Sequence, residues 1–395
     1  MVKVVLFDRQ ETRIQFLPLT YTRAISDMRF GMMTIIEKWR KAGFEVLVDT
    51  AEYLQHDLQI TDDKINEALI FIDATTCPSD SLLVSLNNLA SSESIKVNNN
   101  VLAFNGTYSD LKNEQYLMFK SSDVALDSVL MLNKISDLFA KNHIAIEQDY
   151  EVLTNSQSSS AIDKTCTLLG DKLFLEEGVT AHCAIFNTLD GPIFIDKNAQ
   201  IMEGSMLRGP LYVGENSVVK MGAKIYGATT IGPHCKVGGE VGNSILFGYS
   251  NKGHDGYLGN SILGEWCNLG ADTNTSNLKN NYGPIKTWSY KSDALENTGL
   301  TFHGLIMGDH SKSSINTMFN TGTVVGVCSN IYGGGFPKKF IPSFSWGGKD
   351  GWVDHDPNKA ISTAKAVYAR RKKDLHPQDE SILRHIFNIS GKYRT

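Results

Sequence analysis

The chain has 395 residues, with 38 Lys and Arg against 43 Asp and Glu, so its formal net charge is -5. Hydrophobic residues make up 42 % and charged residues 21 %, which excludes a largely disordered chain. The mild acidity argues against a general nucleic-acid binder, and no apolar run reaches the ~18 residues that a membrane-spanning helix needs. The start of the chain does not read as a secretory signal, and six scattered cysteines favour a reduced, cytoplasmic protein.

Glycine is distributed unevenly. Of the 34 glycines, 30 lie between Gly170 and Gly351. This shift predicts three parts: an α/β domain over 1–165, a glycine-rich repeat domain over 166–345 and a helical tail over 346–395.

The first part alternates predicted strands and helices. Residues 2–7, 44–48 and 69–72 are short apolar runs typical of strands, while residues 32–42 and 129–139 have helical patterns. Such an alternation predicts a Rossmann-like α/β domain with a mostly parallel sheet.

The beginning of this part is similar to the sugar-phosphate nucleotidyltransferases. Their opening signature is Leu-Ala-Ala-Gly-x-Gly-Thr-Arg, then Leu-x-Pro-Leu-Thr. The matching residues here are Leu6, Thr12, Arg13, Leu17, Pro18, Leu19 and Thr20. The resemblance implies a nucleotide-binding domain that uses magnesium, with Asp73 at the end of a strand close to the family's metal-binding aspartate.

Arg9 and Glu11 replace both loop glycines of that signature, and Asp8 replaces an alanine. Those glycines let backbone N–H groups close on a triphosphate, so bulky side chains and new carboxylates there predict a degenerate nucleotide site. Two interpretations of the remaining cations stay open. Arg13, Arg23 and Arg29 contact a nucleotide or sugar phosphate, or they are solvated or paired with Asp8, Glu11 and Asp27.

The middle part carries a six-residue repeat. Every sixth residue from 189 is Leu, Ile or Val: Leu189, Ile195, Ile201, Leu207, Val213, Val219, Ile225, Ile231 and Val237. A period of six fits a triangular parallel β-helix, in which each hexad forms one face and the aliphatic residues stack in a central column. Known hexapeptide solenoids wind left-handed, so the fold expected here is a left-handed β-helix.

The frame slips after Val237, resumes through Ile245, Leu263 and Leu269, breaks across 275–305, and returns at Met307, Phe319, Val325 and Ile331. Interruptions of a solenoid are loops on one face, and such loops often carry function. The alternative is that these loops only plug an end or mediate oligomer contacts.

Three segments around these interruptions resemble the acetyltransferase half of the bifunctional bacterial enzymes of the GlmU type. That family has a Lys-x-x-His-x-x-Tyr-Leu-Gly-like segment, then Asn-Ile-Gly-Ala-Gly, then Asn-Tyr-Asp-Gly followed by a lysine. The resemblance implies His254 as the catalytic base. The substrate-binding positions that it implies are Lys252, Tyr257, Asn268, Asn281, Tyr282 and Lys286.

The resemblance also implies a homotrimer that uses acetyl-CoA as acyl donor, with sites between subunits. Its acceptor would be an amino-sugar phosphate or a nucleotide-linked amino sugar, as in the synthesis of cell-envelope sugars. A neutral imidazole suits this chemistry, because the attacking amine must lose a proton. Asp272 replaces a family glycine, and residues 278–280 are additional, so the acceptor can differ from glucosamine 1-phosphate.

Two further functions compete with acyl transfer: transfer of a nucleotidyl group to a sugar 1-phosphate, with Mg²⁺, and a non-catalytic trimeric scaffold that binds a sugar nucleotide. The spacing of the histidines in the repeat predicts no metal site.

The tail predicts two helices. One begins at Asp356-Pro357 and runs through 360–373, and the other opens at His376-Pro377. Residues 356–395 carry nine Lys and Arg against four Asp and Glu. We expect the tail to cap the open end of the solenoid, with a contact to coenzyme A phosphates as the alternative.

Overall fold

The structure is a computed structural model that describes residues 2–54, 56–60, 67–125 and 129–394. The chain divides into two compact units. The N-terminal unit consists of residues 1–16, 23–28 and 33–135, and the solenoid unit of residues 17–22, 29–32 and 136–395. The contacts therefore divide the chain near residue 135, and two short early segments belong to the later unit.

The N-terminal unit is built on a six-stranded sheet with the order β4-β1-β5-β7-β6-β8. The β1–β4, β1–β5 and β6–β8 pairs are parallel, and the β5–β7 and β6–β7 pairs are antiparallel. The mostly parallel sheet that we expected is therefore a mixed sheet. The strands are β1 (Lys3–Phe7), β4 (Glu45–Asp49), β5 (Leu69–Asp73), β6 (Glu93–Val97), β7 (Asn100–Gly106) and β8 (Lys120–Asp123).

The helices of this unit are short. They are α1 (Gln10–Arg13), α2 (Ile35–Lys41), α3 (Asp80–Asn87) and α4 (Tyr108–Lys112); the short strand β3 (Met33–Thr34) precedes α2. Helix α2 begins at a capping box in which Thr34 and Glu37 exchange hydrogen bonds. The predicted helix over 129–139 is wrong, because only α5 (Asp137–Ala140), which belongs to the solenoid unit, is helical there.

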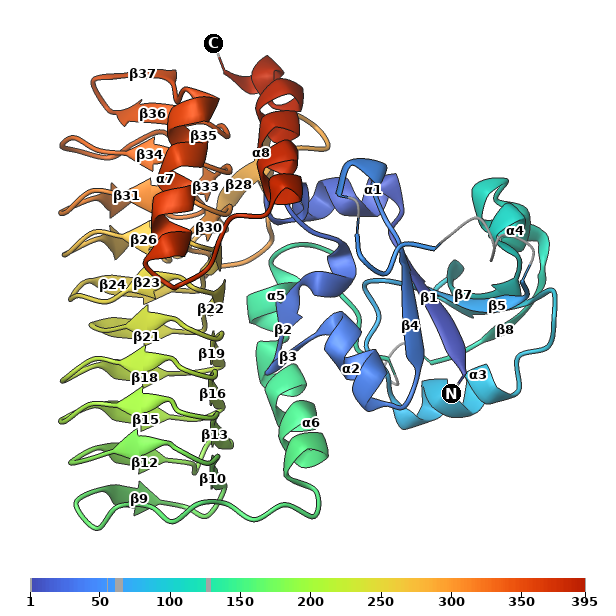
Figure 1. Cartoon of the computed structure of the whole chain (residues 1–395), viewed down its shortest axis with the longest axis horizontal. Coiled ribbons are helices and arrows are strands. Elements are labelled where there is room, and N and C mark those ends of the chain that lie inside the picture. The colour runs from blue at the N-terminus through green and yellow to red at the C-terminus, as the bar shows by residue number, and fades with distance from the viewer. Residues whose placement is uncertain (1, 55, 61–66, 126–128, 395) are drawn as a thin grey trace. The chain divides into compact units, whose positions relative to one another are not determined.

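The solenoid unit is a triangular parallel β-helix (Figure 1). Its first face is a nine-stranded sheet, its second face a ten-stranded sheet and its third face a six-stranded sheet. The first face consists of β10 (Leu173–Leu175), β13 (Ile193–Ile195), β16 (Leu211–Val213), β19 (Thr229–Ile231), β22 (Ile245–Gly248), β25 (Ile262–Glu265), β30 (Ile306–Met307), β33 (Val324–Val325) and β35 (Phe340–Ile341).

The second face consists of β11 (Thr180–Ala181), β14 (Gln200–Ile201), β17 (Val218–Val219), β20 (Lys236–Val237), β23 (Asn251–Lys252), β26 (Asn268–Leu269), β31 (Lys312–Ser313), β34 (Asn330–Ile331), β36 (Ser345–Gly348) and β37 (Gly351–Asp354). The third face consists of β9 (Thr167–Leu169), β12 (Ile185–Asn187), β15 (Met206–Arg208), β18 (Lys224–Tyr226), β21 (Glu240–Gly242) and β24 (Tyr257–Gly259). The short strands β27 (Asn274–Thr275) and β32 (Met318–Phe319) pair in parallel beyond them.

The predicted aliphatic column is confirmed from Ile195 to Val237, whose members lie in one buried cluster. Leu189 is the exception, because it is 70 % exposed. The turn between β12 and β13 is longer than a hexad allows, so Phe186 takes the inward position instead. After Val237, where the frame of six slips, Leu246 and not Ile245 faces the column, beside Ile231. A shift of one residue turns a strand residue to the opposite face.

The interruption over 275–305 is confirmed as a long loop. It contains the antiparallel hairpin of β28 (Lys286–Ser289) and β29 (Ala294–Asn297). The solenoid resumes at β30, which pairs with β25 in parallel. The column then continues through Met307, Phe319, Val325 and Ile331, as expected.

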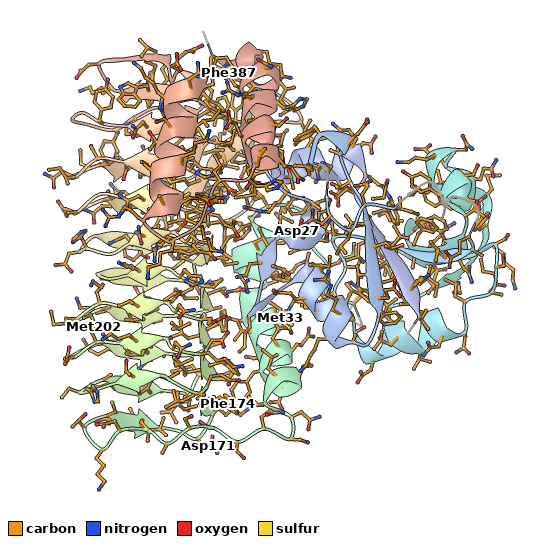
Figure 2. The ribbon with its side chains drawn as sticks, in the orientation of Figure 1. Asp27, Met33, Asp171, Phe174, Met202 and Phe387 are labelled. Carbon is orange, nitrogen blue, oxygen red and sulfur yellow. The ribbon has the colours of Figure 1, made fainter. Side chains whose placement is uncertain are left out.

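Helix α6 (Asn142–Thr154) lies along the first face of the solenoid, beside Phe174 (Figures 1 and 2). Its Ile146 packs in a cluster with Phe174, Phe194 and Tyr212. The sequence pattern did not predict this helix. The side that it buries includes Asn142 and Asp149. Their side chains accept hydrogen bonds from the backbone N–H groups of Gly31 and Met32, which directly follow β2 (Arg29–Phe30).

The tail forms α7 (Pro357–Ala369) and α8 (Pro377–Ile389), which both begin with a capped proline as predicted. Helix α7 lies beside the coils, with Tyr368 stacked on Trp266 at 3.9 Å between ring centroids. Within the predicted tail, the β36–β37 hairpin lies at the end of the solenoid, and its Trp352 packs against the column. Among the described residues, no helix is long and apolar enough to cross a membrane.

Candidate functional site

The predicted base, His254, lies at the corner between the second and third faces, in the turn that joins β23 to β24. The turn requires Gly256, whose φ is +116° and where a Cβ would lie 2.3 Å from the carbonyl oxygen of Thr273. The imidazole of His254 is exposed, and no hydrogen bond or ion pair holds it among the residues that the structure describes. His254 is therefore open to a ligand.

Lys252 lies directly behind this turn, in a position that the sequence did not predict. Its neighbours on the second face are Val237 and Leu269, both in the aliphatic column, so its side chain points into the solenoid. Lys252 is only 1 % exposed. Its Nζ donates to the carbonyl oxygens of Gly238 (3.3 Å), Asp255 (3.2 Å) and His254.

Burial lowers the pKa of Lys252 to about 8, against the opposing effect of the carboxylates of Asp255 and Asp272. An ammonium group that donates to three carbonyls inside the solenoid does not reach a sugar phosphate at the surface. We therefore reassign Lys252 from substrate binding to positioning: it fixes the carbonyl groups of the turn that presents His254.

Tyr257, three residues after His254, belongs to a chain of hydrogen bonds. Its hydroxyl accepts from Nδ2 of Asn277 (3.0 Å), which also donates to Oδ1 of Asn260 (2.8 Å). Its backbone N–H donates to Oδ1 of Asn274 (2.8 Å). Burial raises the pKa of Tyr257, with the Asn277 hydrogen bond opposing, so the phenol keeps its proton near neutral pH.

Asn260, Asn274 and Asn277 are candidate site residues that we missed in the sequence. A signal was present: Asn260 and Asn277 are separated by 17 residues, and Asn243 lies 17 residues before Asn260. That spacing corresponds to one coil here, because residue pairs such as Val241 and Leu258 are in register. The recurrence of asparagine every 17 residues could therefore have predicted that these side chains stack along one corner of the solenoid.

Asn268 is half-buried on the outward side of the second face, one coil after Asn251. The side-chain amide of Asn251 donates to Oδ1 of Asn268 (3.3 Å). The other three predicted residues lie in the long loop. Tyr282 is 71 % exposed, Asn281 accepts from the backbone of Gly283, and Lys286 is exposed at the start of β28.

No hydrogen bond or ion pair in the described part of the chain joins Asn281, Tyr282 or Lys286 to His254. The structure therefore brings Lys252, His254 and Tyr257 together at one corner, and it presents the other three on a separate, solvent-exposed loop.

The predicted nucleotide site in the N-terminal unit is filled by the chain's own side chains. Arg13 is buried, and its Nη1 donates to Oδ2 of Asp8 (2.5 Å) and to Oγ1 of Thr50 (2.7 Å). Burial raises the pKa of Asp8, while the charge of Arg13 and the hydrogen bonds of Thr50 and Ile25 oppose that effect. Of the two interpretations of Arg13, the structure shows pairing with Asp8.

Asp73 ends β5, as predicted, but its carboxylate is already engaged. Oδ1 accepts from the backbone and the hydroxyl of Thr75 (3.0 and 2.6 Å), and Oδ2 lies 3.6 Å from Nη2 of Arg9. Arg9 also donates to the carbonyl of Val101 and lies over the ring of Phe7. Arg9, which replaces a loop glycine of the nucleotidyltransferase signature, thus places its guanidinium group beside Asp73. Asp73 is the carboxylate for which the resemblance implies magnesium binding.

Arg23 and Arg29 are both buried. Arg23 lies in the N-terminal unit, whereas Arg29 lies in the solenoid unit, where its Nε donates to the carbonyl of Phe247 (3.1 Å). Within the N-terminal unit, Nη1 of Arg13 also donates to the carbonyl oxygen of Arg23 (3.3 Å). No group of three or more His, Cys, Asp or Glu residues within the described ranges is arranged to hold a metal ion.

Comparisons with known proteins find similarity over parts of the chain. Residues 4–158 match the family described as sugar nucleotidyl transferase. The chain is 37 % identical over 87 residues to the Bifunctional protein GlmU of Methanocaldococcus jannaschii; this covers 22 % of the chain. It spans only about a fifth (21 %) of the length of that curated relative.

Solved hexapeptide proteins resemble it more distantly. The polySia-specific acetyltransferase NeuO covers 53 % of this chain and 99 % of its own, with 14 % identity and a TM-score of 0.29. A hexapeptide transferase family protein from Anaplasma phagocytophilum covers 58 % of this chain and 90 % of its own, with 17 % identity and a TM-score of 0.19. Likeness at this level says nothing about activity.

The predicted fold class, a nucleotidyltransferase-like α/β part followed by a left-handed β-helix and a helical tail, is confirmed. The chain thus has a sugar-nucleotidyltransferase-like beginning over residues 4–158, followed by a hexapeptide-repeat solenoid.

Proposed function

We propose that the chain is an N-acyltransferase that moves an acetyl or other acyl group from coenzyme A to an amino-sugar phosphate or a nucleotide-linked amino sugar. The observation that carries this proposal is the corner of the solenoid where Lys252 fixes the turn and His254 is left exposed and without a partner among the described residues. A base that must meet a diffusing substrate needs that combination of a rigid backbone and a free imidazole.

In this mechanism His254 takes the proton of the acceptor amine as its nitrogen forms a bond to the thioester carbonyl carbon. The carbon–sulfur bond then breaks, and the proton passes to the leaving thiolate. Asn268 is proposed as a donor to the developing oxyanion, and Tyr257 contacts the acceptor. The exposed Asn281, Tyr282 and Lys286 would meet the acceptor or the acyl donor from the long loop.

The proposal includes a homotrimer in the cytoplasm and a role in making cell-envelope sugars. The outward side of the third face supports the oligomer, since Ile185 and Met206 are in register and both are exposed. Exposed apolar residues aligned on adjacent strands are typical of a surface that another chain covers.

The test is acyl transfer by the full chain with acetyl-CoA and a panel of amino-sugar phosphates and nucleotide-linked amino sugars. We expect His254→Ala to lower turnover by about 10²–10⁴-fold, as loss of a general base does. His182→Ala is the matched control, because His182 precedes the left-handed residue of an earlier corner in the same series. Equal turnover in wild type and His254→Ala would remove the assignment.

A second candidate is nucleotidyl transfer to a sugar 1-phosphate with Mg²⁺, which the sugar nucleotidyl transferase match over 4–158 favours. The Arg9–Asp73 pair weighs against it. Calorimetry with Mg²⁺ and nucleoside triphosphates tests it: no heat of binding would exclude this activity. A chain that binds neither coenzyme A nor any sugar phosphate would instead be a scaffold.

A further inference from the structure

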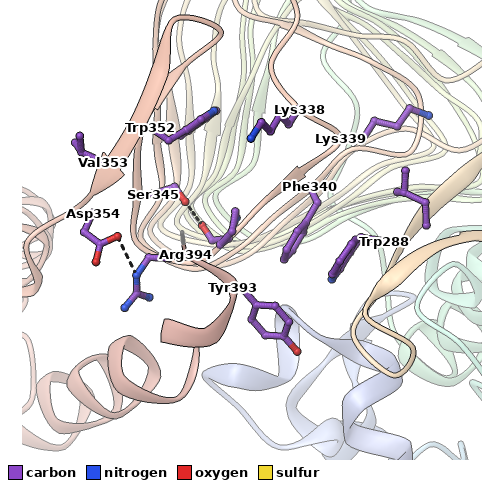
Figure 3. A pocket seen from close by; sticks show the side chains of 12 residues that line it. Trp288, Lys338, Lys339, Phe340, Ser345, Trp352, Val353, Asp354, Tyr393 and Arg394 are labelled. Carbon is purple, nitrogen blue, oxygen red and sulfur yellow. Dashed lines mark hydrogen bonds and ion pairs between the residues drawn. The ribbon is translucent and has the colours of Figure 1, made fainter.

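A cavity of about 390 Å³ lies at the C-terminal end of the solenoid, away from the His254 corner (Figure 3). The β28–β29 hairpin, strands β35 to β37 and the last residues of the chain supply its walls. Its volume lies in the range of small-molecule sites. Four strand spacings of the second face, about 19 Å, separate β23 from β36 along the solenoid axis.

One wall of the cavity is aromatic. Trp288 and Phe340 are stacked, with ring centroids 4.0 Å apart and planes within 5°. Tyr393 stands edge-on to Phe340, at 5.7 Å and 89°. Flat apolar surfaces arranged in this way offer a face and an edge to a flat aromatic body.

Three cationic side chains also line the cavity: Lys338, Lys339 and Arg394 (Figure 3). Lys338 is exposed, and no side-chain interaction engages it within the described part of the chain. Nζ of Lys339 donates to Oγ1 of Thr321 (3.3 Å) and to the carbonyl oxygen of Lys286 (3.4 Å), so its ammonium group is already engaged. Arg394 pairs with Asp354 (3.3 Å), so Asp354 neutralises one of the three cations that line the cavity.

Burial lowers the pKa of Lys339, and the charge of Lys279 adds to this effect. Of the three cations that line the cavity, only Arg394 is paired with a carboxylate among the described residues. Figure 3 shows the side chains of Lys338 and Lys339 extending away from one another, so an anion in the cavity would meet the unengaged Lys338, whose ammonium group can bind phosphate as a point charge.

We propose that this cavity binds a nucleoside monophosphate, with the base against the stacked pair of Trp288 and Phe340 and the phosphate at Lys338. All residues that line the cavity belong to the solenoid unit. It does not depend on the function proposed above, because its walls contain none of the residues of that corner.

The test uses tryptophan fluorescence of the full chain, since Trp288 and Trp352 both line the cavity. AMP and UMP are titrated beside adenosine, inorganic phosphate and glucose 1-phosphate. We expect saturable quenching by at least one of the two nucleotides, and at least 10-fold weaker binding of the nucleoside and of the two non-aromatic phosphates.

The variants separate the two halves of the site. Lys338→Ala changes an exposed side chain, so it should fold normally and weaken nucleotide binding about 5- to 10-fold while binding of adenosine stays unchanged. Lys338→Arg should restore most of the affinity. Phe340→Leu keeps an apolar side chain but removes the stack, and it should weaken nucleotide and nucleoside alike. Lys164→Ala is the matched control, an exposed lysine just before β9 at the other end of the solenoid.

Several results would overturn the proposal: no saturable quenching by either nucleotide, equal affinity for glucose 1-phosphate, or unchanged affinity in Lys338→Ala. Displacement of the nucleotide by coenzyme A would show instead that the cavity belongs to the acyl-donor site. Asp73→Asn must leave the titration unchanged; a loss of binding there would place the nucleotide in the N-terminal unit.

Discussion

Replacing Lys252 by methionine removes a charged group that points into the aliphatic column, while keeping a side chain of similar length. The carbonyl oxygens of Gly238 and His254 then lose the ammonium donor that they share. Each buried carbonyl left without a donor costs about 1–3 kcal/mol. Near pH 7 the removal of a buried positive charge offsets part of that loss.

The offset disappears as the pH rises. Above about pH 8 the folded protein holds this amine neutral, whereas the unfolded chain binds the proton up to its ordinary pKa of 10.5. The unfolded state then binds more protons, so the free energy of unfolding of the wild type rises with pH relative to the variant. Between about pH 7 and about pH 9.5 the gap should widen by about 2 kcal/mol, at ~1.4 kcal/mol per pH unit beyond the folded pKa.

Urea denaturation of both proteins at the two pH values measures this gap. Other titrating groups are common to both chains and cancel in the difference. Lys224→Met is the matched control, because Lys224 is exposed on the third face and its substitution should leave the gap independent of pH. A gap for Lys252→Met that stays constant or narrows at high pH would refute a buried, deprotonating Lys252.

Three further substitutions test the packing. Ile225→Ala should lower the free energy of unfolding by about 2–5 kcal/mol, because the side chain lies in the column; a loss below about 1 kcal/mol would contradict a packed column. Leu189→Ala should change the free energy of unfolding by less than about 0.5 kcal/mol, since Leu189 is exposed. A loss of about 2 kcal/mol or more would show instead that Leu189 packs in the column. Arg13→Met should cost about 3–5 kcal/mol at neutral pH by leaving Asp8 buried without its cation; thermal melts that match the wild type would exclude that pair as a structural element.

The solenoid could be predicted from the sequence because each six-residue repeat specifies its own inward-facing position. An aliphatic residue at a fixed spacing must face the column, so the pattern predicted the positions from Ile195 to Val237. The pattern failed where a turn changes length. Leu189 kept the spacing of six, but the longer turn after β12 gives the inward position to Phe186.

Polar groups with a buried role were harder to predict. Helix α6 buries Asn142 and Asp149 against backbone N–H groups, which breaks the apolar stripe that marks a helix in sequence. The residues around Lys252 in the sequence predict a surface lysine, because its inward position depends on the register of β23 against β20. The motif identified His254 and Tyr257, but only tertiary contacts identify Asn277 as the partner of Tyr257.

We propose that this chain transfers acyl groups in its solenoid and does not transfer nucleotidyl groups in its N-terminal unit. One reaction measures both: the full chain with acetyl-CoA, a panel of amino-sugar phosphates and nucleotide-linked amino sugars, Mg²⁺ and nucleoside triphosphates. Free coenzyme A thiol and pyrophosphate are followed in the same sample. We predict thiol release that depends on the amino sugar, without pyrophosphate. Pyrophosphate release without free thiol would contradict the account.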